Sequence, residues 1–78
     1  MTTFGQRLKM LREEKGMSQQ DMIENLKTRE IFISKSTYSK WESNTHEPGY
    51  FIIKILRNYF KVDADYLLGI TDKIRKEE

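Results

Sequence analysis

Hydrophobic residues recur at helical spacing along most of the chain. Phe4, Leu8 and Leu11 stand four and three residues apart, so they fall on one stripe of an amphipathic helix. Gly16 follows this stripe and suits the left-handed backbone conformation that commonly ends a helix. The pattern predicts a first helix over about residues 3–15.

Residues that cap helix N-termini mark where the other helices begin. Ser18 and Asp21 form a capping box, in which each side chain accepts a hydrogen bond from the other's backbone N–H. Ser34 and Asp63 are in position to cap the third and fifth helices, and Pro48, the only proline, suits the approach to the fourth. We therefore predict a second helix that begins at Ser18 and further helices over about residues 35–43, 49–60 and 62–69.

No segment alternates apolar and polar residues with the two-residue period of a strand. The chain also contains no internal repeat and no low-complexity tract. We predict an all-α fold in one domain, residues 1–70, followed by a charged C-terminal tail at residues 71–78.

The third predicted helix has two chemically different sides. A helical projection at about 100° per residue places Thr37, Tyr38 and Trp41 on one arc. The opposite arc holds only serines and lysines, namely Lys35, Ser36, Ser39, Lys40 and Ser43. We expect the two aromatic side chains to anchor this helix in the core and the serine–lysine arc to be presented outward.

Composition narrows the setting but does not identify a partner. The chain has 78 residues, which is about the lower limit for one hydrophobic core without disulfides or metals. Its net charge is only +2, too small an excess of positive charge to indicate nucleic-acid binding by itself. The chain has no cysteine, which excludes disulfides and thiolate metal sites and fits a reducing, cytoplasmic location. No apolar run approaches the ~18 residues of a membrane span, so we expect no membrane association.

Four segments, in this order, resemble the phage Cro/repressor-type helix-turn-helix family, often called XRE. They are FGQRLKMLREEKGMSQQDM (4–22), STYSKWES (36–43), EP (47–48) and VDADYLLG (62–69). The resemblance implies a five-helix, lambda-repressor-like domain whose helices 2 and 3 form the helix-turn-helix. It also implies a sequence-specific regulator of transcription, most simply a repressor from a bacterium or its phage, that binds double-stranded operator DNA. Helix 35–43 would then lie in the major groove.

The resemblance assigns roles to individual residues. The positions that reach bases or nearby phosphates are Lys35, Ser36, Ser39 and Lys40. The positions expected to bind phosphates are Gln19, at the start of helix 2, and Ser43, Asn44 and Thr45, after helix 3. Arg12 and Glu42 match a pair that forms an ion bridge between helices 1 and 3 in the family; the alternative is two solvated charges worth little.

One segment departs from the family pattern. Relatives have a short turn containing glycine between helices 2 and 3, whereas KTREIFIS (27–34) is longer and has none. Lys27 and Arg29 could add contacts to the DNA backbone. The alternative, which we favour, is a tolerated surface insertion with Ile31 or Phe32 packed onto the core.

Catalytic chemistry has no support in the sequence. His46 is the only histidine, so it has no partner for a metal site, and no nucleophile–base pairing or phosphate-binding glycine loop is present. We expect no enzymatic activity, no cofactor, no metal and no small-molecule ligand.

The fourth helix is apolar around more of its circumference than one stripe requires. We expect some of Phe51, Ile52, Ile55 and Tyr59 to be exposed in a monomer or covered by a partner. A homodimer through helix 49–60 is the favoured interpretation, and extra packing within the domain is the alternative. The same surface would suit a protein partner if the fold served as an antitoxin or anti-repressor module.

Overall fold

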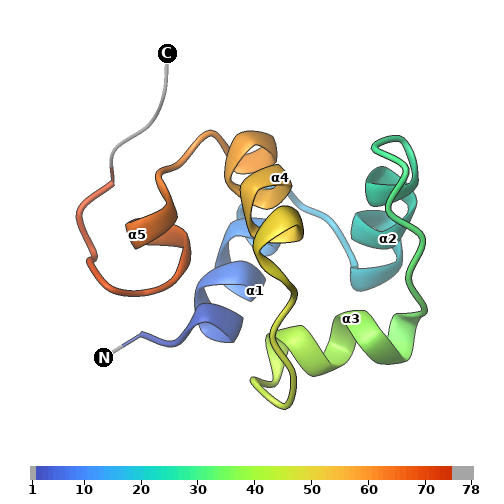
Figure 1. Cartoon of the computed structure of the whole chain (residues 1–78), viewed down its shortest axis with the longest axis horizontal. Helices are drawn as coiled ribbons and strands as arrows, with labels where there is room; N and C mark the ends of the chain where they lie inside the picture. Colours follow the sequence, from blue (N-terminus) through green and yellow to red (C-terminus); the bar gives the residue numbers. More distant parts are fainter. Residues whose placement is uncertain (1, 75–78) are drawn as a thin grey trace.

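Helices form where the capping signals stand. The computed structural model describes residues 2–74, which contain five helices and no β-strand, so the all-α prediction is confirmed (Figure 1). The helices are α1 (Phe4–Glu14), α2 (Gln19–Lys27), α3 (Lys35–Glu42), α4 (Tyr50–Phe60) and α5 (Ala64–Leu67). Figure 1 shows α2 at one end of the molecule and α5 at the other, with α1 and α4 between them.

Side-chain caps begin four of these helices. In α2, Ser18 Oγ accepts from the Asp21 backbone N–H and Asp21 Oδ2 accepts from the Ser18 N–H, both at 3.0 Å. Thr3 and Gln6 form an equivalent capping box at the start of α1. Single side-chain caps begin α3 and α5, where Ser34 and Asp63 accept from the backbone of Thr37 and Tyr66. These caps satisfy N–H groups that no residue within the helix can reach.

All five helices of residues 2–74 are followed by a residue in the left-handed conformation. The five residues, each with φ between 57° and 79°, are Gly16, Glu30, Asn44, Lys61 and Gly69. At the end of α2, Ile31 N–H donates to Leu26 O and Glu30 N–H donates to Lys27 O, both at 3.0 Å. This is the Schellman pattern, which satisfies the last carbonyls of a helix. Glu30 therefore occupies the position that glycine commonly fills.

The long turn between α2 and α3 is attached to the domain at two points. Ile31 is buried in the core, while Phe32 is 73% exposed, so the expectation that one of them packs inward is confirmed for Ile31. The Arg29 guanidinium lies over the ring of Tyr59 in α4, 4.5 Å from its centroid. A longer turn therefore does not leave the start of α3 loosely held.

Every helix contributes at least one side chain to a single core. The most deeply buried of these are Leu8, Met22, Leu26, Tyr38, Leu56 and Leu67. Trp41 is also buried, with its ring centroid 5.7 Å from that of Tyr38, so the predicted anchoring of α3 by two aromatic residues is confirmed. Thr37, expected on the same side, is exposed because it lies at the edge of the apolar arc, in the first turn of α3.

Helices α1 and α3 touch through their backbones. A Cβ atom on Gly5 would collide with backbone atoms of Glu42 and would lie 2.7 Å from Trp41 O, so only glycine permits this approach. The Asn44 side chain completes the contact, because its Oδ1 accepts from Gly5 N–H at 2.9 Å and its Nδ2 donates to Thr3 Oγ1 at 2.8 Å. The start of α1 and the end of α3 are thus held in one fixed relation.

The segment after α5 is bound to α1 by a buried arginine. Arg7 Nη1 donates to Tyr66 O at 2.7 Å, and the Arg7 guanidinium lies 3.8 Å from the centroid of the Tyr66 ring. Arg7 also pairs with Asp72 and donates to Thr71 O. The first residues of the expected tail therefore contact the domain, and residues 75–78 lie outside the described part. The boundary at residue 70 stays a prediction.

Glu30→Gly should stabilise the domain by about 0.5–1 kcal/mol, because a side chain in the left-handed conformation costs roughly 1–2 kcal/mol and added freedom of the unfolded chain offsets part of that gain. Urea denaturation of both proteins measures the difference. Thr28→Gly is the matched control: Thr28 has a helical φ of −66°, so glycine there should lower the free energy of unfolding. Equal effects at both positions would contradict the argument.

Candidate nucleic-acid interface

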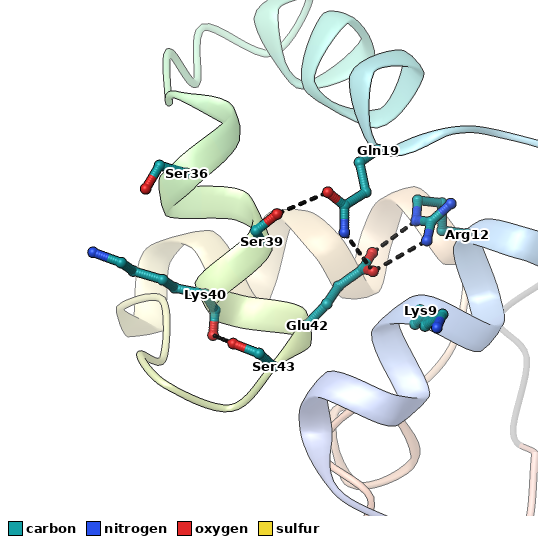
Figure 2. Close-up of a pocket in the computed structure, with 8 residues that line it drawn as sticks. All are labelled: Lys9, Arg12, Gln19, Ser36, Ser39, Lys40, Glu42 and Ser43. Atoms are coloured by element: carbon teal, nitrogen blue, oxygen red, sulfur yellow. Dashed lines mark hydrogen bonds and ion pairs between the residues drawn. The ribbon is translucent and has the colours of Figure 1, made fainter.

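A shallow concavity of about 610 Å³ lies where α1, α2 and α3 meet (Figure 2). Eight side chains line it, namely Lys9, Arg12, Gln19, Ser36, Ser39, Lys40, Glu42 and Ser43. Five of them were predicted to bind DNA and two more to form the supporting ion pair. The structure therefore brings most of the predicted residues to one surface, although it does not test whether any of them touches DNA.

The remaining predicted contacts lie at the two ends of α3. Lys35 is exposed in the first turn of α3, and Asn44 and Thr45 follow its last turn. The Asn44 side-chain amide is bound to α1, so it is engaged inside the domain. Thr45 Oγ1 lies 2.8 Å from Ser43 Oγ, and both residues are exposed. Phosphate binding by these residues stays a prediction.

Arg12 and Glu42 form a bidentate ion pair between α1 and α3. Arg12 Nε donates to Glu42 Oε2 at 2.7 Å and Arg12 Nη2 donates to Glu42 Oε1 at 3.1 Å. The two side chains are only 8% and 5% exposed. Arg12 Nη1 also donates to Met17 O at 2.6 Å, which ties the pair to the turn before α2. The pairing is therefore a buried bridge and not two solvated charges.

The ion pair keeps both groups ionised. Burial alone would raise the pKa of Glu42, but hydrogen bonds from Arg12 and Gln19 outweigh burial and lower it. The hydrogen bond to Glu42 raises the pKa of Arg12 in turn. Because Arg12 is neutralised by Glu42, the free positive charge around the concavity comes from the exposed lysines Lys9 and Lys40.

Gln19 connects the ion pair to the outward face of α3. Its Nε2 donates to Glu42 Oε1 at 3.1 Å, and its Oε1 accepts from Ser39 Oγ at 2.8 Å (Figure 2). The Gln19 side chain is thus engaged within the domain. A phosphate at this place would be bound by the unpaired backbone N–H groups at the start of α2, where the helix dipole also favours an anion.

Sequence reasoning missed Lys9, which lines the concavity from α1. Lys9 stands three residues before Arg12 in one helix, and residues at that spacing share a face. The ion-pair assignment of Arg12 therefore contained the signal that Lys9 faces α3.

Other kinds of site receive no support from the described part of the chain. Among residues 2–74, no cluster of three or more histidine, cysteine, aspartate or glutamate side chains has an arrangement suited to a metal ion. None of the helices in this range has the length and apolar character needed to cross a bilayer.

Glu42→Gln should lower the free energy of unfolding by about 3 kcal/mol at pH 7, because it leaves the Arg12 charge buried without its partner. The folded-state pKa of Glu42 is below its unfolded value of about 4.3, so the contribution of the carboxylate is complete above pH ~5 and is lost as the pH falls through the folded pKa. Urea denaturation from pH 7 to pH 2.5 should therefore show the two proteins converging in acid.

Glu47→Gln is the control for that measurement, since Glu47 is exposed and makes no ion pair within residues 2–74. Its difference from the wild type should stay near zero at every pH. A Glu42→Gln deficit that did not shrink in acid would contradict the ionic origin of the stabilisation.

Comparison with known proteins agrees with this architecture. Residues 5–72 match the model of a helix-turn-helix domain family. The chain is 32% identical over 66 residues to the HTH-type transcriptional activator BcrR of Enterococcus faecalis, covering 85% of this chain and 30% of that protein. It is 33% identical over 69 residues to the uncharacterized HTH-type transcriptional regulator YobD of Bacillus subtilis (strain 168), covering 88% of this chain and 57% of that protein.

The chain spans less than two thirds of the length of either relative. No solved structure matches it significantly. The family match nevertheless covers nearly the whole described fold, including the two helices and the turn that define the motif. This protein belongs to the XRE-type helix-turn-helix family of DNA-binding transcription regulators.

Proposed function

We propose that the protein is a sequence-specific regulator that binds double-stranded DNA and reads the major groove with α3. The observation that carries this proposal is the division of α3 into two sides. Tyr38 and Trp41 are buried, whereas Lys35, Ser36 and Lys40 are exposed on the surface that also includes the concavity. A helix held in this way presents serine and lysine side chains outward, and the major groove is wide enough to admit an α-helix.

Contacts to the DNA backbone would set the register of α3. Lys9 and Lys40 are exposed and supply positive charge at the concavity, and the start of α2 supplies backbone N–H groups. Serine hydroxyls are short and can donate or accept a hydrogen bond, so Ser36 and Ser39 suit contacts to base edges. In this arrangement the lysines and the backbone N–H groups contact the DNA backbone, and the serines contact the bases.

Repression is the simplest regulatory outcome, because a small domain bound over a promoter excludes polymerase. One relative carries the name of an activator and the other that of a regulator. The place of the operator relative to the promoter would decide which outcome applies, and the domain fold supports either. Action on bacterial or phage operators would place the protein in the cytoplasm.

A homodimer is the proposed binding form. Of the four apolar side chains considered on α4, only Phe51 is largely exposed, at 70%, and the neighbouring Tyr50 is 78% exposed. The other three, Ile52, Ile55 and Tyr59, are partly buried against the core. Covering Tyr50 and Phe51 with a second copy would remove apolar surface from water. Two copies of α3 about 34 Å apart would then read two half-sites one turn of DNA apart.

Selection from a random duplex pool at low salt should enrich one motif. Binding to that motif should weaken steeply as salt rises, because each neutralised phosphate releases counterions. Lys40→Ala should weaken binding and reduce the slope of log affinity against log salt by about one per bound protomer. Fluorescence anisotropy titrations at several salt concentrations measure both quantities.

Lys73→Ala provides the matched control, since Lys73 is an exposed lysine after α5 that lies neither at the concavity nor on α4. Its affinity and salt slope should equal those of the wild type. Failure of the selection to enrich any motif would refute DNA reading and would favour the antitoxin or anti-repressor type of protein-interaction module.

Phe51→Glu should raise the dimer dissociation constant at least about tenfold, because a central apolar contact would be replaced by a charge. Sedimentation equilibrium with and without DNA measures this change. Phe32→Glu is the control: Phe32 is as exposed as Phe51 but lies in the turn before α3. A wild-type protein that stays monomeric on a single half-site would exclude the dimer.

A further inference from the structure

A row of hydrogen bonds runs from α1 to the outward face of α3. Arg12 donates to Glu42, Gln19 donates to Glu42, and Ser39 donates to Gln19. Figure 2 shows dashed lines linking Arg12, Glu42, Gln19 and Ser39 in this order, and all four side chains line the concavity. The donor and the acceptor of each hydrogen bond can be assigned one after another, starting from the carboxylate of Glu42.

Glu42 is ionised, because Arg12 binds it through two hydrogen bonds and lowers its pKa. An ionised carboxylate only accepts hydrogen bonds. The side of the Gln19 amide that faces Glu42 must therefore be its NH₂ group. The NH₂ group of Gln19 lies 3.1 Å from Glu42 Oε1, as this requires.

The fixed amide of Gln19 decides the state of Ser39. With NH₂ toward Glu42, the amide turns its oxygen toward Ser39, at 2.8 Å. An amide oxygen only accepts, so Ser39 must donate its single hydroxyl proton to it. The Ser39 hydroxyl is left with lone pairs and no proton for any group that approaches from outside.

We propose that Ser39 acts as a hydrogen-bond acceptor toward DNA, and that it therefore selects a cytosine or an adenine at the base it contacts. This inference rests on the proposed function. In the major groove, cytosine presents its N4 amino group and adenine its N6 amino group as donors, whereas guanine and thymine present only acceptors and a methyl group. Gln19 is then a positioning residue: it sets the specificity of Ser39 without touching a base.

Ser36 provides an internal comparison for the Ser39 hydroxyl. It lies one turn before Ser39 on the same surface, and its hydroxyl has no hydrogen-bond partner among the described residues. A free hydroxyl rotates to donate or to accept, so Ser36 does not discriminate donors from acceptors. The two serines should therefore differ in specificity although their chemistry is identical.

The test compares motifs selected from a random duplex pool by wild-type protein, Ser39→Ala, Ser36→Ala and Gln19→Met. The position whose preference disappears in Ser39→Ala is the Ser39 position. Wild-type protein should enrich cytosine or adenine there. Gln19→Met removes the acceptor that holds the Ser39 proton, so guanine and thymine should become acceptable at that position. Ser36→Ala should leave the preference for cytosine or adenine at the Ser39 position unchanged.

A base analogue tests the same contact directly. Replacing the preferred adenine by purine, or the preferred cytosine by pyrimidin-2-one, removes the donor amino group. Wild-type affinity should fall roughly three- to tenfold, as expected for one hydrogen bond, and Ser39→Ala affinity should not change. Thermal melts of the Gln19→Met and Ser39→Ala proteins establish that both variants are folded.

Three outcomes would overturn the inference while leaving the proposed function intact. They are a selected motif with guanine or thymine at the Ser39 position, a motif unaffected by Ser39→Ala, and an unchanged preference in Gln19→Met. Enrichment of no motif by the wild-type protein would instead refute the proposed function, and this inference with it.

Discussion

The buried ion pair between Arg12 and Glu42 is the interaction on which the candidate interface depends. It joins the last turn of α1 to the last residue of α3, and through Met17 O it reaches the start of α2. A charge buried without its partner costs about 3–5 kcal/mol, whereas replacing both partners by apolar residues is often neutral. The pair therefore serves to position α3 and to orient Gln19 more than to add net stability.

Close packing of α1 on α3 supplies the second constraint. Gly5 allows the two backbones to touch, and Asn44 ties the end of α3 to the start of α1. Tyr38 and Trp41 anchor the apolar side of α3, so its serines and lysines are left facing outward. Ile31 attaches the turn before α3 to the core.

The sequence by itself determined the helices and their order. Caps such as Ser18 with Asp21, and stops such as Gly16, act within four or five residues, so they can be read without knowing what lies across the fold. The two sides of α3 were also predictable, because helical periodicity separates serine and lysine from the aromatic residues. The Arg12–Glu42 pair came from family resemblance, since thirty positions separate its members.

Tertiary structure alone decided what the polar side chains do. Gln19 and Asn44 were both assigned to phosphates, yet their amides bind Ser39 and Gly5, which lie 20 and 39 positions away. No local pattern specifies such partners, because they depend on the angle at which helices pack. The burial of Arg7 against the segment after α5 has the same origin. The chain's local chemistry specifies where helices begin and end, and only their packing determines which side chains remain free for DNA.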